Sequence, residues 1–164
     1  YILETIGLSE RQIQYLIFTG IITAIPSALI WGKLVDKYKP KIILSIVLTL
    51  WICNLIISIS AGIIEINDNI WWFVSGFTGI LISGVWSCDR PFMHQLISDE
   101  FIGEYFGLHG FSGRLGSIIG TASWGFIVTT LNLGQPIALT SLGLCILLSL
   151  IIILSIKTNN IKNE

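Results

Sequence analysis

The chain has 164 residues, a formal net charge of −1 at pH 7 and a hydrophobic fraction of 53%, while Asp, Glu, Lys and Arg make up only 12%. An ordinary soluble domain carries about a quarter charged residues, so this composition excludes a soluble globular domain. The nearly neutral charge also argues against nucleic acid as a partner. We therefore expect an integral membrane protein embedded in a lipid bilayer.

Long stretches without charged side chains predict five membrane spans. Crossing a hydrocarbon core of roughly 30 Å takes about 20 apolar helical residues. Because backbone groups in lipid must be paired internally, the spans should be helices, and continuous Ile and Leu runs do not fit a β-barrel. The predicted fold class is an all-α polytopic membrane helical bundle. Its spans are expected at about 12–32, 42–64, 69–88, 106–131 and 137–156.

The first span follows residues 1–11, which we interpret as the end of a preceding helix and an outer loop. The chain would then be the later part of a longer protein. Within this span, polar residues recur every four positions and so share one helix face. Pro26 stands beside the last of them and usually kinks a helix. The stripe consists of Tyr15, Thr19, Thr23 and Ser27.

A lysine-rich turn, Lys33–Lys41, separates the first two spans and helps to set the orientation. With five spans, this turn, the segment Arg90–Glu104 and the tail Lys157–Glu164 lie on one side, which holds seven of the nine basic residues. Basic residues stay cytoplasmic, so the tail, residues 157–164, is predicted to be cytoplasmic. The aromatic run Trp71–Phe73 then forms an anchor at the outer start of the third span.

The third span carries a second stripe, whereas the second and fifth spans look lipid-facing. The usual reason for small polar residues in a span is close helix packing. The alternative is that the stripes of the first, third and fourth spans face a hydrated cavity. The members of the third-span stripe are Ser75, Gly79, Ser83 and Ser87.

The fourth span combines glycines with an arginine. Gly113, Gly116 and Gly120 form a seam on which another helix can pack. Arg114 points away from that seam, on a face shared with Ser117 and Thr121 among others. An arginine at mid-bilayer costs about 2.5–3.5 kcal/mol, so it rarely faces lipid. Either Arg114 snorkels at the cytoplasmic boundary, or it lies about 15 Å deep and needs a partner.

The turn "GKLVDKYKPK", Gly32 to Lys41, resembles the loop signature of the major facilitator superfamily. Gly32, Asp36, Lys37 and Lys41 match that pattern, although Lys39 stands where a second glycine is usual and Ile42 replaces a final basic residue. Without the resemblance, the same stretch would be an ordinary cytoplasmic basic turn.

The stretch Gly84–Gly125 is similar to the vacuole-effluxer family, a branch of that superfamily related to autophagy-linked amino-acid exporters. Asp89 and Pro91 depart from the small hydroxyl residues expected there. The resemblance implies helices eight to twelve of a twelve-helix transporter, with the N-terminal half of the same chain as a partner. The resembling residues are Arg90, Leu96-Ile97, Glu104–Leu108 and Gly113-Arg114.

The combined prediction is a secondary transporter that moves a small solute, with an amino acid as the family-level solute, by alternating access. The alternative is a non-transporting membrane receptor or scaffold on a transporter fold. We predict no enzyme, no cofactor and no metal site, because His94 and His109 form no HExxH pattern and Ser87, Asp89 and His94 lack a nucleophile-elbow motif. The expected location is the plasma (inner) membrane, or a vacuolar-type membrane in a eukaryote.

Two groups of residues are the predicted sites. Charged residues near the cytoplasmic side would form a gate whose ion pairs are made in one state and broken in the other; otherwise they only set topology. The candidate gate is Asp36, Lys37, Arg90, Glu104 and Arg114. Polar and aromatic residues would line the solute path; otherwise they only pack helices. The candidate path is Thr23, Ser27, Ser83, Trp86, Ser117 and Thr121.

Overall fold

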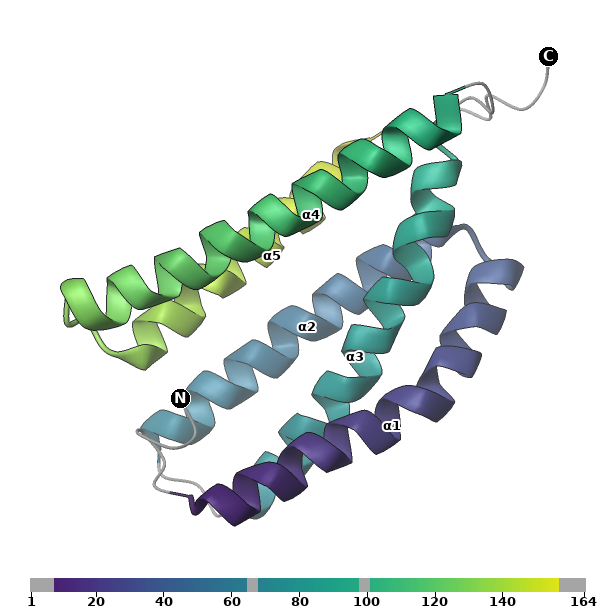
Figure 1. The fold of residues 1–164 in the computed structure, drawn as a ribbon. Coiled ribbons are helices and arrows are strands. Elements are labelled where there is room, and N and C mark those ends of the chain that lie inside the picture. The colour runs from purple at the N-terminus through teal and green to yellow at the C-terminus, as the bar shows by residue number, and fades with distance from the viewer. Residues whose placement is uncertain (1–7, 65–67, 98–100, 157–164) are drawn as a thin grey trace.

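The computed structural model describes residues 8–64, 68–97 and 101–156, and the regular structure within these ranges is entirely helical. The predicted all-α bundle is therefore confirmed. The elements in chain order are α1 (Glu10–Lys37), α2 (Pro40–Ile63), α3 (Asn69–His94), α4 (Ile102–Gly125), the short π-helix η3 (Phe126–Thr130) and α5 (Gln135–Ser155) (Figure 1).

In the part of the chain that the structure describes, four helices are long and apolar enough to cross a membrane, namely α1, α2, α3 and α5. The fourth predicted span is also helical, as α4 and η3, but α4 is less apolar. Its 24 residues include seven glycines together with Glu104 and Arg114. The spans expected from charge-free runs thus coincide with helices. Helix α4 is less apolar than the other four because glycines stand where those helices have aliphatic side chains.

Local sequence signals account for the ends of α1. Ser9 caps the helix: its hydroxyl accepts a hydrogen bond from the Gln12 backbone N–H, and the Gln12 side chain accepts one from the Ser9 N–H. This reciprocal arrangement satisfies two backbone donors that the first turn leaves free. At the other end, Lys39 is extended because it precedes Pro40, which opens α2 at the first helical turn.

Helix α3 lies at the centre of the packing, between α1 and α2, and α2 in turn packs against α5. One cluster of buried side chains joins α1, α2 and α3 through Trp31, Val47 and Leu81. Helix α2 has the largest buried share of these spans. Helices α3 and α5 cover two sides of α2, while Ile42, Ile46 and Ile56 stay exposed on its remaining surface.

A second cluster corrects the predicted aromatic anchor. Trp71 is only 2% exposed and packs with Leu16, Ala61 and Val74 between three helices. Trp72 and Phe73 do remain exposed. Adjacent residues on a helix point about 100° apart, so a run of three aromatic residues cannot all face the same environment.

Helix α4 runs beside α5 and contributes no buried residue (Figure 1). Residues 110–119 are all exposed, and Cβ atoms added at Gly113, Gly116 and Gly120 would meet no described atom within 4 Å. The glycine seam predicted for helix packing is therefore uncovered by the described residues.

Candidate functional site

The two polar stripes found in the sequence meet each other where α1 packs on α3. The Thr23 hydroxyl donates a hydrogen bond to the Gly76 carbonyl at 2.8 Å, and the Ser27 and Ser83 hydroxyls share one at 2.7 Å. Ser75 donates to the Leu16 carbonyl. Small side chains allow the helices to approach closely, so backbone carbonyls of one helix come within reach of hydroxyls on the other.

The tryptophan at the end of this contact extends the same pattern. The Trp31 indole N–H donates to the Ile80 carbonyl at 2.9 Å. A Cβ atom on Gly84 would lie 3.0 Å from the same indole nitrogen and 2.9 Å from Val47 Cγ2, so a side chain at this position would force its neighbours to shift. Interhelical hydrogen bonds thus continue over more than half the length of α1, and α1 and α3 form a firmly joined pair.

A groove of about 780 Å³ lies along one side of this pair. Isoleucines of α1 form much of its wall, and Trp71 and Trp86 of α3 lie among its lining residues. The hydroxyl-bearing residues in its lining all belong to α3 and are Ser75, Thr78, Ser83 and Ser87. The groove is a mainly apolar surface with hydroxyl groups along one edge, which suits a solute or segment with both apolar and polar parts.

The six candidate path residues fall into three groups. Ser83 and Trp86 line the groove, and the Trp86 side chain is 76% exposed. Thr23 and Ser27 lie in the α1–α3 contact beside it. Ser117 and Thr121 lie on the exposed surface of α4, where the Thr121 hydroxyl donates to the Ser117 carbonyl.

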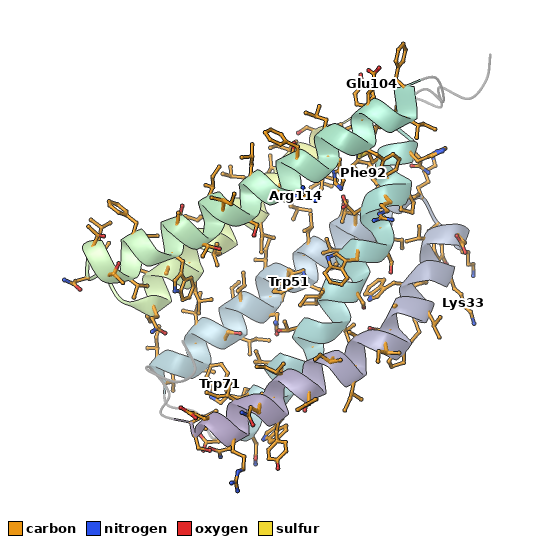
Figure 2. The ribbon with its side chains drawn as sticks, in the orientation of Figure 1. Lys33, Trp51, Trp71, Phe92, Glu104 and Arg114 are labelled. Atoms are coloured by element: carbon orange, nitrogen blue, oxygen red, sulfur yellow. The ribbon has the colours of Figure 1, made fainter. Side chains whose placement is uncertain are left out.

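The candidate gate residues are exposed and mostly gather at one end of the helices. Asp36 and Lys37 lie at the end of α1, Arg90 lies near the end of α3, and Glu104 lies at the start of α4. Figure 2 labels Glu104 itself, and it labels Lys33 and Phe92 near the ends of α1 and α3. Lys37 Nζ lies 5.4 Å from the centre of the Tyr38 ring. Arg114 lies farther along α4 (Figure 2). Among the residues with described positions, these five form no ion pair with one another.

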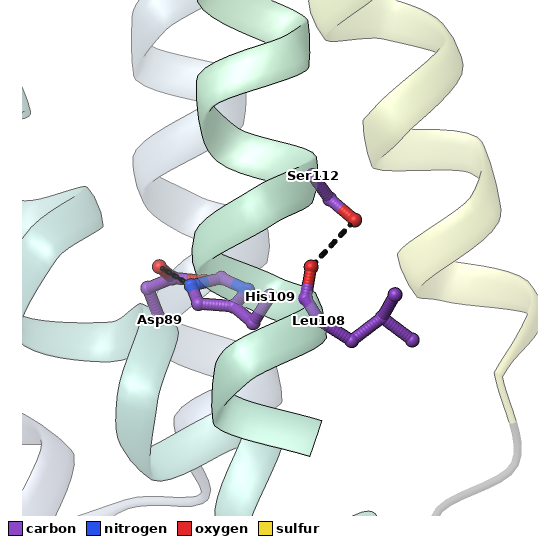
Figure 3. Close-up of polar contacts among 4 residues, drawn as sticks. All are labelled: Asp89, Leu108, His109 and Ser112. Atoms are coloured by element: carbon purple, nitrogen blue, oxygen red, sulfur yellow. Dashed lines mark hydrogen bonds and ion pairs between the residues drawn. The ribbon is translucent and has the colours of Figure 1, made fainter. Parts of the chain in front are cut away.

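One polar contact was missed by the sequence reasoning. His109 Nε2 lies 2.9 Å from Asp89 Oδ2 and joins α4 to α3 (Figure 3). From the sequence, Asp89 is a departure from a family pattern and a member of the dismissed set Ser87, Asp89 and His94, and His109 is a residue without a metal-binding motif. Their separation of twenty positions carries no periodic signal, since the two residues lie on different helices, α3 and α4. An acid and a histidine at the facing ends of two consecutive spans are the clue that was available.

The thiols and acids give no metal site in the described ranges. There, His, Cys, Asp and Glu side chains form no group of three that could hold a metal ion. Cys53, Cys88 and Cys145 are free thiols.

Comparison with known proteins bears on this arrangement. The family profile described as Major Facilitator Superfamily matches residues 1–164. Among curated proteins, the chain is similar to the uncharacterized MFS-type transporter YxiO of Bacillus subtilis (strain 168), with 21% identity over 115 residues. The matched region is 70% of this chain and 26% of that relative, so it spans about a quarter of the relative's length. No solved structure matches the chain.

Proposed function

Because the chain belongs to the major facilitator superfamily, we propose that it forms the C-terminal helical part of a secondary transporter. The whole protein would move a small solute across a membrane by alternating access, in which two helical halves rock about a central site. The N-terminal half would be supplied by the same polypeptide. The observation that carries this proposal is the groove along α1 and α3, with hydroxyl groups on an otherwise apolar wall.

The α1–α3 contact supports a rocking mechanism. Rocking requires each half to move as a unit, and hydrogen bonds across a close helix contact resist sliding of one helix along the other. Thr23, Ser27 and Trp31 supply such bonds from α1 to α3. In this proposal they hold the wall, while Ser83 and Trp86 touch the solute.

Ser117 and Thr121 would complete the solute path from α4. Both are exposed on a helix that also carries Arg114. A charged or polar helix face inside a membrane normally turns toward water or a partner. When the two halves assemble, this face of α4 would therefore border the same hydrated passage as the groove.

The gate is proposed at the end of the bundle where α1 and α3 stop and α4 starts. Asp36, Lys37, Arg90 and Glu104 would pair with charges of the opposing half, and Arg114 would pair deeper in the passage. Exposed ion pairs contribute only about 0–1 kcal/mol each. That is enough to bias two conformations whose free energies differ by little.

Finer assignments rest on the sequence. We propose the vacuole-effluxer branch, an amino-acid solute, a cytoplasmic C-terminus, and a plasma or vacuolar-type membrane, from the resemblance over Gly84–Gly125 and the one-sided basic residues. The amino-acid solute depends on the vacuole-effluxer assignment, because the resemblance to that branch is the reason to propose an amino acid.

Solute flux tests the proposal. The complete polypeptide is reconstituted in liposomes, and uptake of labelled neutral, acidic and basic amino acids is measured with and without a pH gradient. Saturable uptake of one class, competed by unlabelled solute, is the expected result. Binding of a solute without flux would instead identify a receptor, and neither binding nor flux with any amino acid would remove the amino-acid assignment.

A further inference from the structure

The groove along α1 and α3 has an uncharged wall. Among the described residues that line it there is no Asp, Glu, Lys, Arg or His. The wall consists of aliphatic and tryptophan side chains, together with the hydroxyl groups of α3. Moving an ion out of water without a counter-charge costs several kcal/mol. The part of a solute that enters the groove is therefore expected to be uncharged.

The hydroxyl groups at the groove edge already donate their protons to acceptors of the protein. The Ser83 proton goes either to the Ile80 carbonyl or to the Ser27 hydroxyl. The other three hydroxyls donate to backbone carbonyls, so the edge offers oxygen lone pairs to the groove. These three bonds run from Ser75 to Leu16, from Thr78 to Val74 and from Ser87 to Ser83.

A count of hydrogen bonds shows which solute groups suit this edge. A hydroxyl group has one proton to donate and two lone pairs that accept. A solute acceptor could bond only to a proton withdrawn from a protein acceptor, so the number of hydrogen bonds would not rise. A solute donor adds a bond to a lone pair and breaks none. The edge therefore favours N–H and O–H groups over carbonyl and ether oxygens.

Ser87 is the hydroxyl with the most free acceptor capacity toward the groove. Thr78 Oγ1 already accepts a bond from Asn54 Nδ2 at 2.9 Å, and the hydroxyl of Ser75 is directed at α1. Within residues 8–64, 68–97 and 101–156, Ser87 Oγ donates at 2.8 Å within its own helix and accepts nothing. Its neighbour Trp86 is mostly exposed and also lines the groove, so an apolar ring surface lies beside this oxygen.

We propose that the groove takes an uncharged, mainly apolar part of the solute that carries an N–H or O–H group, and that Ser87 Oγ accepts a hydrogen bond from that group. The lone pairs of the edge carry partial negative charge, which complements the partial positive charge of a donor hydrogen. The proposal rests on the groove being the solute path, as proposed above. In an amino-acid solute, the side chain would occupy the groove, and both charged groups would stay outside it. Ser87 is then a specificity-determining residue.

Indole and benzofuran are matched probes of this site. They have nearly the same size and shape, but indole has an N–H where benzofuran has a ring oxygen. Binding to the complete polypeptide in detergent is measured by equilibrium dialysis against empty micelles, which corrects for partition into detergent. We expect the parent protein to bind indole more tightly than benzofuran. Indole-3-acetate, which adds a carboxylate, should bind about ten-fold more weakly than indole or worse, because its charge would lose water.

Variants of Ser87 separate the hydrogen bond from other differences between the probes. In Ser87→Ala, the ratio of the two Kd values should shift by about five-fold toward benzofuran, as for the loss of one hydrogen bond. Ser87→Thr keeps the oxygen and should keep the parent ratio, and so should Ser149→Ala on α5. If Ser87→Ala misfolds in gel filtration, Ser87→Cys makes the same test, because a thiol is a weak acceptor.

The outcomes distinguish this inference from transport. An unchanged ratio in Ser87→Ala, absence of indole binding, or tighter binding of benzofuran or indole-3-acetate than of indole by the parent protein overturns the proposal. Solute flux together with any of these results would leave transport standing and remove the role of Ser87. The expected shift in ratio without flux of any solute would contradict transport and leave the binding site standing.

Discussion

Gly20 of α1 and Gly79 of α3 mark the closest approach of the two helices: a Cβ atom on Gly79 would lie 1.9 Å from the Gly20 carbonyl oxygen. Backbone meets backbone at this point, so no side-chain movement can make room. The hydrogen bonds on either side, from Ser75 to Leu16 and from Thr23 to Gly76, depend on this approach.

Gly79→Ala should therefore destabilise the chain even though alanine favours helices. An overfilled helix contact typically costs about 1–3 kcal/mol, and we expect a value near the upper end, seen as a lower melting temperature in detergent. Gly76→Ala is the control, because its Cβ would make only ordinary contacts, with Thr23 Cγ2 at 3.6 Å and Thr19 Cγ2 at 3.7 Å. Equal melting temperatures for the two variants would contradict the close contact.

The bond between Ser27 and Ser83 should show a measurable coupling. Polar side-chain pairs between membrane helices contribute about 0.6 kcal/mol on average in double-mutant cycles. We expect a coupling of that size from Ser27→Ala, Ser83→Ala and the double variant, measured by unfolding in detergent. Ser149→Ala, on an exposed position of α5, should be neutral. Strict additivity of Ser27→Ala and Ser83→Ala would show that the hydroxyls do not interact.

Lys41 should hold the end of α5 against the start of α2. Its Nζ donates to the Leu154 carbonyl at 3.1 Å and to the Ile156 carbonyl at 2.5 Å, two groups that a helix end leaves without partners. Lys41→Met keeps the apolar stem and removes the donor. Backbone amide hydrogen exchange at residues 152–156 should become about five-fold faster or more, because a lost hydrogen bond lowers local stability by about 1 kcal/mol. Lys39→Met, at an exposed position, should leave exchange there unchanged.

Trp86 should matter for the solute and little for stability. The side chain is 76% exposed and lines the groove. Exposed substitutions usually change stability by less than about 0.5 kcal/mol, so Trp86→Ala should melt like the parent while its KM for uptake rises several-fold. Trp72→Ala, also exposed but outside the groove, should leave KM unchanged. A matching KM increase in both variants would remove Trp86 from the path.

Arg114 should be needed for transport and dispensable for folding of this part of the chain. It lies on the exposed middle of α4. Arg114→Ala should reduce uptake and efflux in liposomes about ten-fold or more, because a charge-assisted contact is lost. Arg114→Lys should retain part of the activity because the positive charge remains. Normal uptake and efflux in Arg114→Ala would show that Arg114 has no transport role.

Helix positions and helix faces could be read from the sequence because they depend on neighbours along the chain. A charge-free run of about 20 residues can span a membrane only as a helix, and proline at position 40 separates α1 from α2 wherever the rest of the chain lies. The four-residue spacing of Thr19, Thr23 and Ser27 likewise sets one face of α1. For these features no tertiary information was required.

The partners of those faces depended on tertiary structure, because a helical period says which residues share a side but not which helix covers it. The stripes of α1 and α3 could equally have faced water, yet Ser27 and Ser83 meet in a buried contact. Burial of Trp71, the covered sides of α2 and the bond from His109 to Asp89 were hidden for the same reason. The sequence alone determined which segments become apolar helices, since hydropathy and backbone pairing are local; only the fold decided which helices touch, since packing joins residues far apart in the chain.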